Sequence, residues 1–152
     1  MDRDIAQRLQ ELERRIDGLN LPEVGDGQPV FLSEPYTNTT FDGDSFSTVA
    51  AHTKIENTSW STTIPANAVA LIILAQCRDS GSAGTANLFV KLFSTATATN
   101  EALNVRPDGK PNDWITSAQG VVPCTSGDIW YRVTASGAST MDVWFTCAGY
   151  WL

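Results

Sequence analysis

Short runs in which apolar and polar residues alternate, separated by turn-forming residues, fill the chain from about residue 41 to its last residue. In the run DIWYRV, which begins at Asp128, every second residue is apolar and would share one face of a strand. We expect strands at residues 47–56, 60–64, 68–78, 87–95, 114–122, 129–135 and 141–150. This pattern predicts a mainly β protein, a jelly-roll-like antiparallel β-sandwich.

One run is apolar on both faces. Residues 69–75 read VALIILA, with no polar residue at alternate positions. Such continuity is typical of a strand buried on both sides. We therefore predict a central strand that is covered on one side by the core and on the other by something else, such as a neighbouring subunit.

The first 20 residues have a different period. Their apolar residues are spaced four, three, four and three apart, at Ile5, Leu9, Leu12, Ile16 and Leu19. This is the seam of a heptad repeat, and Gly18 and Pro22 end the helix. A single helix of about 18 residues is only marginally stable in water. Residues 1–20 are therefore expected to form a coiled coil, and docking of the helix on its own β domain is the alternative.

Charged residues flank this seam. Arg8 falls at heptad position g and Glu13 at the following e, where they can pair between neighbouring helices. The stretch RLQELE, residues 8–13, resembles the Arg-h-x-x-h-Glu trimerisation motif of short three-stranded coiled coils. This resemblance implies a homotrimer. Its expected trimerisation residues are Ile5, Arg8, Leu9, Leu12, Glu13, Ile16 and Leu19.

A segment rich in proline, glycine and acidic residues follows the helix. Residues 21–40 contain one short apolar patch, Val30 to Leu32, and are expected to form a linker or collar. The predicted organisation is a coiled-coil helix at 1–20, a collar at 21–40 and a β-sandwich head at 41–152.

The charge balance argues against two classes of partner. The formal net charge is -7, and the few basic residues beyond residue 15 are scattered singly. Nucleic acids and anionic membranes need a basic surface, so neither is expected as a partner. No run of about 18 apolar residues occurs, and charge begins at Asp2, so we expect neither a transmembrane helix nor a signal peptide.

Candidate catalytic and metal-binding groups are sparse. His52 is the single histidine and is expected at a half-exposed strand position. Asp42 and Asp44, with Asp26 upstream, could offer oxygen ligands to calcium, but a solvated turn is the preferred interpretation. We therefore expect no enzymatic activity, no catalytic residue, no cofactor and no metal.

The cysteines lie in or beside apolar runs. Cys77, Cys124 and Cys147 lack the close spacing of a metal or redox motif. Buried free thiols are the preferred interpretation, with one disulfide and a spare thiol as the alternative.

The tryptophans suggest a ligand. An exposed indole ring can stack on the apolar face of a sugar while nearby polar groups bind its hydroxyls. The candidate ligand-binding residues are Arg106, Asp108, Asn112, Asp113 and Trp114. For each of the five tryptophans, a place in the core or in a subunit interface is the alternative.

Residues 60–73, WSTTIPANAVALII, are similar to a run found in phage β-sandwich domains and related bacterial surface domains. The layout of helix, collar and β-sandwich resembles a small fibre, spike or decoration protein of a tailed bacteriophage. The resemblance implies a virion-surface protein made in the host cytoplasm, a homotrimeric short fibre whose heads bind host-surface glycans. Other virion proteins, in the capsid or tail, would contact its helix or collar. The alternatives are a capsid decoration or head-fibre protein with a purely structural role, or a cellular lectin-like carbohydrate-binding module.

Overall fold

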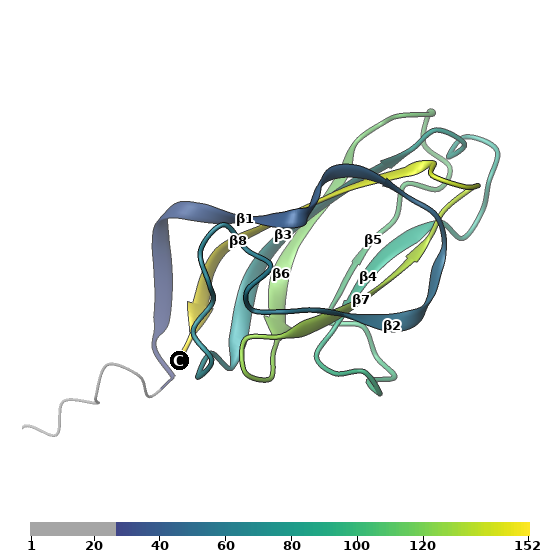
Figure 1. The fold of residues 1–152 in the computed structure, drawn as a ribbon. Helices are drawn as coiled ribbons and strands as arrows, with labels where there is room; N and C mark the ends of the chain where they lie inside the picture. Colours follow the sequence, from purple (N-terminus) through teal and green to yellow (C-terminus); the bar gives the residue numbers. More distant parts are fainter. Residues whose placement is uncertain (1–26) are drawn as a thin grey trace, which may run out of the picture.

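The computed structural model describes residues 27–152 (Figure 1). This part of the chain contains eight β-strands, and none of its residues forms a helix that could cross a membrane. The strands are β1 (Pro29–Phe46), β2 (Val49–Ile55), β3 (Ala70–Asp79), β4 (Phe89–Phe93), β5 (Leu103–Val105), β6 (Thr116–Pro123), β7 (Ile129–Thr134) and β8 (Met141–Trp151). The coiled-coil helix predicted at residues 1–20 lies outside the described residues.

The strands form two sheets of four strands each. The first sheet has the order β1-β8-β3-β6 and the second has the order β2-β7-β4-β5. Every pairing within them is antiparallel. The pairings are nested along the chain, because β1 pairs with β8, β2 with β7, β3 with β6 and β4 with β5. The prediction of a mainly β, antiparallel, sandwich-like fold is confirmed.

The core lies between the two sheets. Along β8, buried and half-buried residues alternate from Met141 to Cys147, and along β7 they alternate from Ile129 to Val133. Because successive side chains of a strand point to opposite faces, each strand turns one apolar face inward. Phe145 of β8 is fully buried, and its ring centroid lies 4.5 Å from that of Phe41 in β1.

Strand β3 is a central strand, as its sequence predicts. It lies between β8 and β6, and its inward residues Leu71 and Ile73 are fully buried. Ile72 points to the opposite face and is nevertheless buried. The continuous apolar run therefore reflects burial on the core side and partial cover on the outer side.

Three segments differ from the expected strands. Residues 60–64 form no strand, and Trp60 makes only an isolated bridge to Asn38. Trp60 and Ile64 are buried instead as loop residues at the edge of the core. The short strand β5 was not expected. Strand β1 begins at Pro29, and residues 29–31, 36 and 37 pair with β8, so they belong to the first sheet.

The connections gather at two opposite ends of the sandwich (Figure 1). Gly27 lies beside Leu152, whose carbonyl accepts a 3.0 Å hydrogen bond from the Gly27 amide. We call this end, which holds Gly27 and Leu152, the proximal end. The other, the distal end, carries the loops between β3 and β4 (residues 80–88), β5 and β6 (106–115) and β7 and β8 (135–140).

Candidate ligand-binding site

A buried carboxylate organises the distal end. Asp79, the last residue of β3, is fully buried. Its Oδ1 accepts hydrogen bonds from the Gly81 amide at 2.8 Å and from the Ser136 hydroxyl, and its Oδ2 accepts them from the Ser136 amide at 3.0 Å and the Thr140 hydroxyl at 3.1 Å. Burial alone would raise the pKa of Asp79, but these hydrogen bonds outweigh it and lower the pKa. The ionised carboxylate therefore ties the β3–β4 loop to the β7–β8 turn.

The β5–β6 loop is fastened to the same strand end. The Asp79 carbonyl accepts a hydrogen bond from the Asp113 amide at 3.0 Å, and the Ser82 carbonyl accepts one from the Gly109 amide at 3.0 Å. The buried Ser82 hydroxyl lies within hydrogen-bond distance of the Pro111 carbonyl, at 3.0 Å. Asn112 completes the clamp, because its Oδ1 accepts from the Ala83 amide at 2.9 Å. Two loops distant in sequence are thus held face to face.

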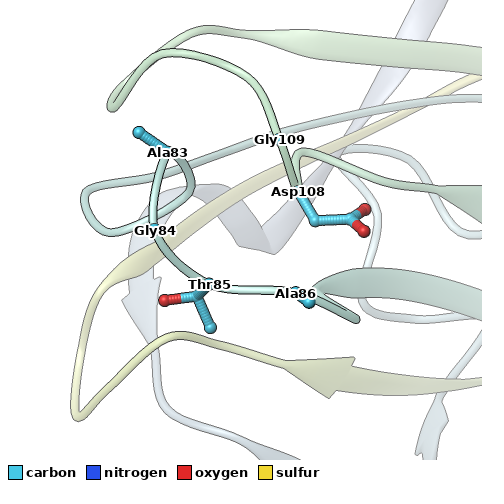
Figure 2. A pocket seen from close by; sticks show the side chains of 6 residues that line it. All are labelled: Ala83, Gly84, Thr85, Ala86, Asp108 and Gly109. Carbon is cyan, nitrogen blue, oxygen red and sulfur yellow. The ribbon is translucent and has the colours of Figure 1, made fainter.

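A pocket of about 290 Å³ opens between these two loops. Figure 2 shows its lining residues on two loops, the β3–β4 loop and the β5–β6 loop. The lining residues are Ala83, Gly84, Thr85, Ala86, Asp108 and Gly109. Asp108 supplies the charge and Thr85 a hydroxyl, and the other four lining residues are alanine or glycine. The pocket is therefore open and shallow, and its lining is partly polar and partly apolar.

Asp108 is held in place by Arg106. The guanidinium approaches the carboxylate with two nitrogens, Nη2 to Oδ2 at 2.9 Å and Nε to Oδ1 at 3.1 Å. The Asn87 amide adds a third hydrogen bond to Oδ2 at 3.3 Å. The hydrogen bonds from Arg106 lower the pKa of Asp108. The pocket thus has a carboxylate of fixed orientation at its wall.

The predicted ligand-binding residues all lie on the β5–β6 segment, but only one lines the pocket. Asp108 does so, Arg106 braces it, and Asn112 is engaged by the neighbouring loop. Asp113 has a left-handed backbone, φ 61°, and an exposed side chain. Trp114 follows it and is 60% exposed, so its ring is available to a ligand.

Sequence patterns did not identify the other half of the site. Residues 79–84 fall between the expected strands at 68–78 and 87–95 and are not among the candidate ligand-binding residues. The signal in this segment is that Gly81 lies two residues after Asp79. At that spacing the Gly81 amide can donate a hydrogen bond to the Asp79 carboxylate. That local pattern predicts the turn, but it carries no sign of the partners on two other loops.

The remaining tryptophans occupy other environments. Trp60 is buried in the core, and Trp130 and Trp151 are half-buried. Trp144 lies on the outer face of the first sheet, where the Arg78 guanidinium stands 5.7 Å from its ring centroid. Arg78 in turn pairs with Asp142 at 2.8 Å. The core interpretation therefore holds for Trp60 and does not hold for the exposed Trp114.

The groups weighed as catalytic or metal-binding are placed as follows. His52 is half-buried, with Nδ1 against the Ala96 carbonyl and its ring 4.2 Å from that of Phe93. Asp42 and Asp44 lie within β1, and Asp42 is exposed. Within residues 27–152, no group of three or more histidine, cysteine or acidic residues could hold a metal ion.

All three cysteines are free thiols. Cys77 and Cys147 are buried and Cys124 is half-buried, as the preferred interpretation of the sequence expects. Burial raises the pKa of each thiol to about 11. None is therefore an activated nucleophile at neutral pH.

No protein-family model matches the chain, and no curated protein matches its sequence. The distal loops offer a fixed carboxylate, a hydroxyl and an exposed indole. Such groups can accept or donate hydrogen bonds and stack on a flat apolar surface.

Proposed function

We propose that this protein is a non-enzymatic attachment module, a homotrimer in which an N-terminal coiled coil displays three jelly-roll heads whose distal loops bind host-surface saccharides. Such a protein would serve as a short fibre on the surface of a bacteriophage virion. The observation that carries the proposal is the placement of the ends. The C-terminus, where the Leu152 carbonyl accepts the Gly27 amide and the rod would join, lies at the opposite end of the sandwich from the β3–β4 and β5–β6 loops (Figure 1). These two loops line the pocket.

The strand connectivity supports the jelly-roll assignment. Two four-stranded sheets with nested pairing are what results when one long antiparallel hairpin is wrapped into a sandwich. Capsid and lectin domains use this double-sheet architecture. Fold alone does not decide between these uses, so the ligand assignment depends on the loops.

The chemistry of the loops favours a saccharide. A pocket of about 290 Å³ is close to the lower end of the range for small-molecule sites and suits a single sugar ring. The Asp108 carboxylate can accept hydrogen bonds from sugar hydroxyls while Arg106 keeps it oriented. The exposed Trp114 ring offers a stacking surface on the same loop.

Trimerisation would compensate for a shallow site. Three linked heads bind a surface with an avidity that exceeds single-site affinity by about a hundredfold or more when the targets match the head spacing. The seam residues from Ile5 to Leu19 supply the linkage, and a parallel coiled coil would point all three pockets away from the rod.

The test is a glycan array probed with labelled full-length protein and with three variants. Trp114→Ala and Asp108→Asn should each lower the signal on the recognised glycan by about tenfold or more, because each removes one direct contact. Ile115→Ala is the matched control, because Ile115 is an exposed apolar residue next to Trp114 in the sequence. This variant should bind the glycan as the parent does. If the trimeric parent binds no glycan above background, the attachment role fails and a structural decoration or head-fibre role replaces it.

A further inference from the structure

An uncharged, apolar patch covers the proximal half of the outer face of the first sheet. Strand pairing places Phe31, Gly149, Ile72 and Val121 in one row across β1, β8, β3 and β6. The next row, two residues along each strand, is Pro29, Trp151, Ala70 and Pro123. We call these eight residues the proximal patch.

The patch faces outward and is open. The residues between the two rows, such as Leu71 and Val122, are fully buried in the core, so the patch residues point the opposite way. Phe31 is 73% exposed and Val121 is 48% exposed. Ile72 is only 8% exposed because it packs over Gly149, where no side chain intervenes. Exposed apolar residues that lie side by side in this way can mark an interaction site.

The same face becomes polar toward the distal end. Beyond the patch, the next row is Thr37, Thr146, Leu74 and Gln119, and farther along Arg78 pairs with Asp142. The apolar character is therefore not a general property of the sheet. It belongs to the end at which the chain enters from residues 1–26.

We propose that the proximal patch is the surface on which the heads of neighbouring copies of this chain pack against one another. This inference rests on the proposed trimer and adds its head-to-head contact. Only residues 20–26 separate the last seam residue, Leu19, from Gly27, a reach of less than about 30 Å. The Gly27 amide donates a hydrogen bond to the Leu152 carbonyl, and Pro29 pairs with Trp151 inside the patch. A coiled-coil seam that joins the copies would therefore hold their patches close to one another.

Charge favours a second copy over other occupants. Each chain carries a formal net charge of -7, so copies repel one another across most of their surface. The proximal patch carries no charge and is thus the face on which copies meet with least repulsion. The competing occupant is the chain's own apolar stripe from Ile5 to Leu19, folded back onto the sheet.

The experiment measures the mass of the full-length protein by light scattering across a concentration series. Val121→Asp places a charge in the patch on the exposed side of an edge strand, where it leaves the core intact. Ile115→Asp is the matched control, since Ile115 is 51% exposed but lies at the distal end. Leu12→Asp disrupts the seam and tests the trimer separately.

The expected result is a trimeric parent and a Val121→Asp variant whose dissociation constant rises by at least about tenfold, because a buried valine contact is replaced by a desolvated charge. Ile115→Asp should leave the dissociation constant unchanged. If Leu12→Asp yields monomers while Val121→Asp matches the parent, the trimer stands and the head contact is overturned. A monomeric parent would overturn both proposals. If the parent is monomeric, proteolysis within residues 1–20 that is faster in Val121→Asp than in the parent would indicate that the patch binds the chain's own apolar stripe from Ile5 to Leu19.

Discussion

Asp79 and Ser136, 57 residues apart in the sequence, are joined by two hydrogen bonds at the distal end. The Ser136 hydroxyl donates to Oδ1 of the carboxylate and the Ser136 amide donates to Oδ2. One carboxylate at the end of β3 therefore fixes the turn that leads into β8. The geometry of the pocket loops depends on this charge.

Asp79→Asn should lower the free energy of unfolding by about 3 kcal/mol at pH 7, because it removes the charge that accepts four hydrogen bonds in a buried place. Urea unfolding followed by tryptophan fluorescence measures the change. Asp113→Asn is the control. Its side chain is exposed and its left-handed backbone suits asparagine, so stability should change by less than about 0.5 kcal/mol.

The same carboxylate predicts an acid dependence. The pKa of Asp79 is lowered in the folded state from an ordinary value of 3.8, so its contribution is complete above that value and is lost as the pH falls through the lower, folded pKa. The parent should lose stability below about pH 4 more steeply than Asp79→Asn. The role assigned to Asp79 would be contradicted if the unfolding free energies of the two proteins fell by the same amount, to within about 1 kcal/mol, between pH 5 and about pH 2.5.

Gly149→Ala should weaken the pairing of β1 with β8. A Cβ at this position would lie 2.5 Å from the Val30 carbonyl oxygen and 3.1 Å from Cδ1 of Ile72, so the strands must move apart. We expect a loss of about 1–3 kcal/mol in unfolding free energy. Gly84→Ala should cost little, because a Cβ there meets no atom within 4 Å. Equal stability of the two variants would show that β1 adjusts without strain.

Arg106→Ala separates binding from stability. The Arg106–Asp108 pair is 2.9 Å long but substantially exposed, so its removal should change unfolding free energy by less than about 1 kcal/mol. Saccharide binding should nevertheless fall by about tenfold, because Asp108 loses its orienting partner. Calorimetry with the array-selected glycan measures the affinity. An unchanged affinity would remove Arg106 from the site.

The thiols should resist modification in the folded protein. Each cysteine has a pKa of about 11, whereas an ordinary thiol has 9.0. The fraction of each thiol that is ionised to thiolate at pH 8 is therefore roughly a hundredfold smaller. An Ellman titration of the native protein should be slow, with Cys124 first because it is only half-buried. In denaturant all three thiols should react at once. A fast native reaction would contradict the burial of Cys77 and Cys147.

Period-two alternation predicts strands that turn one face to the core, and β7 and β8 follow it closely, whereas β3 was predicted from its continuous apolar run. Strand β1 was not predicted because Pro35 and Gly43 interrupt its pattern and its register against β8 shifts three times. β5 is only three residues long, too short for periodicity to detect. The segment from Trp60 to Ile64 was wrongly predicted as a strand, because its buried loop residues are apolar like those of a strand.

Only part of the candidate site could be predicted, because sequence patterns reveal groups that are close together in the chain. Arg106 and Asp108 lie two residues apart, so both could be named as site residues from the local sequence. The opposite wall of the pocket, from Ala83 to Ala86, has no chemical signature in sequence. Its position follows from Asp79, whose partners Gly81 and Ser136 lie on loops that follow strands of different sheets.

The antiparallel ladder between β1 and β8 also determines how the head responds to pulling. A force that enters at Gly27 and leaves through a target held at the distal loops runs along the length of β1 (Figure 1). The ladder hydrogen bonds, from Pro29–Trp151 to Phe46–Met141, are then sheared together rather than opened one after another. A head attached in this way would resist mechanical unfolding more strongly than one pulled across its strands.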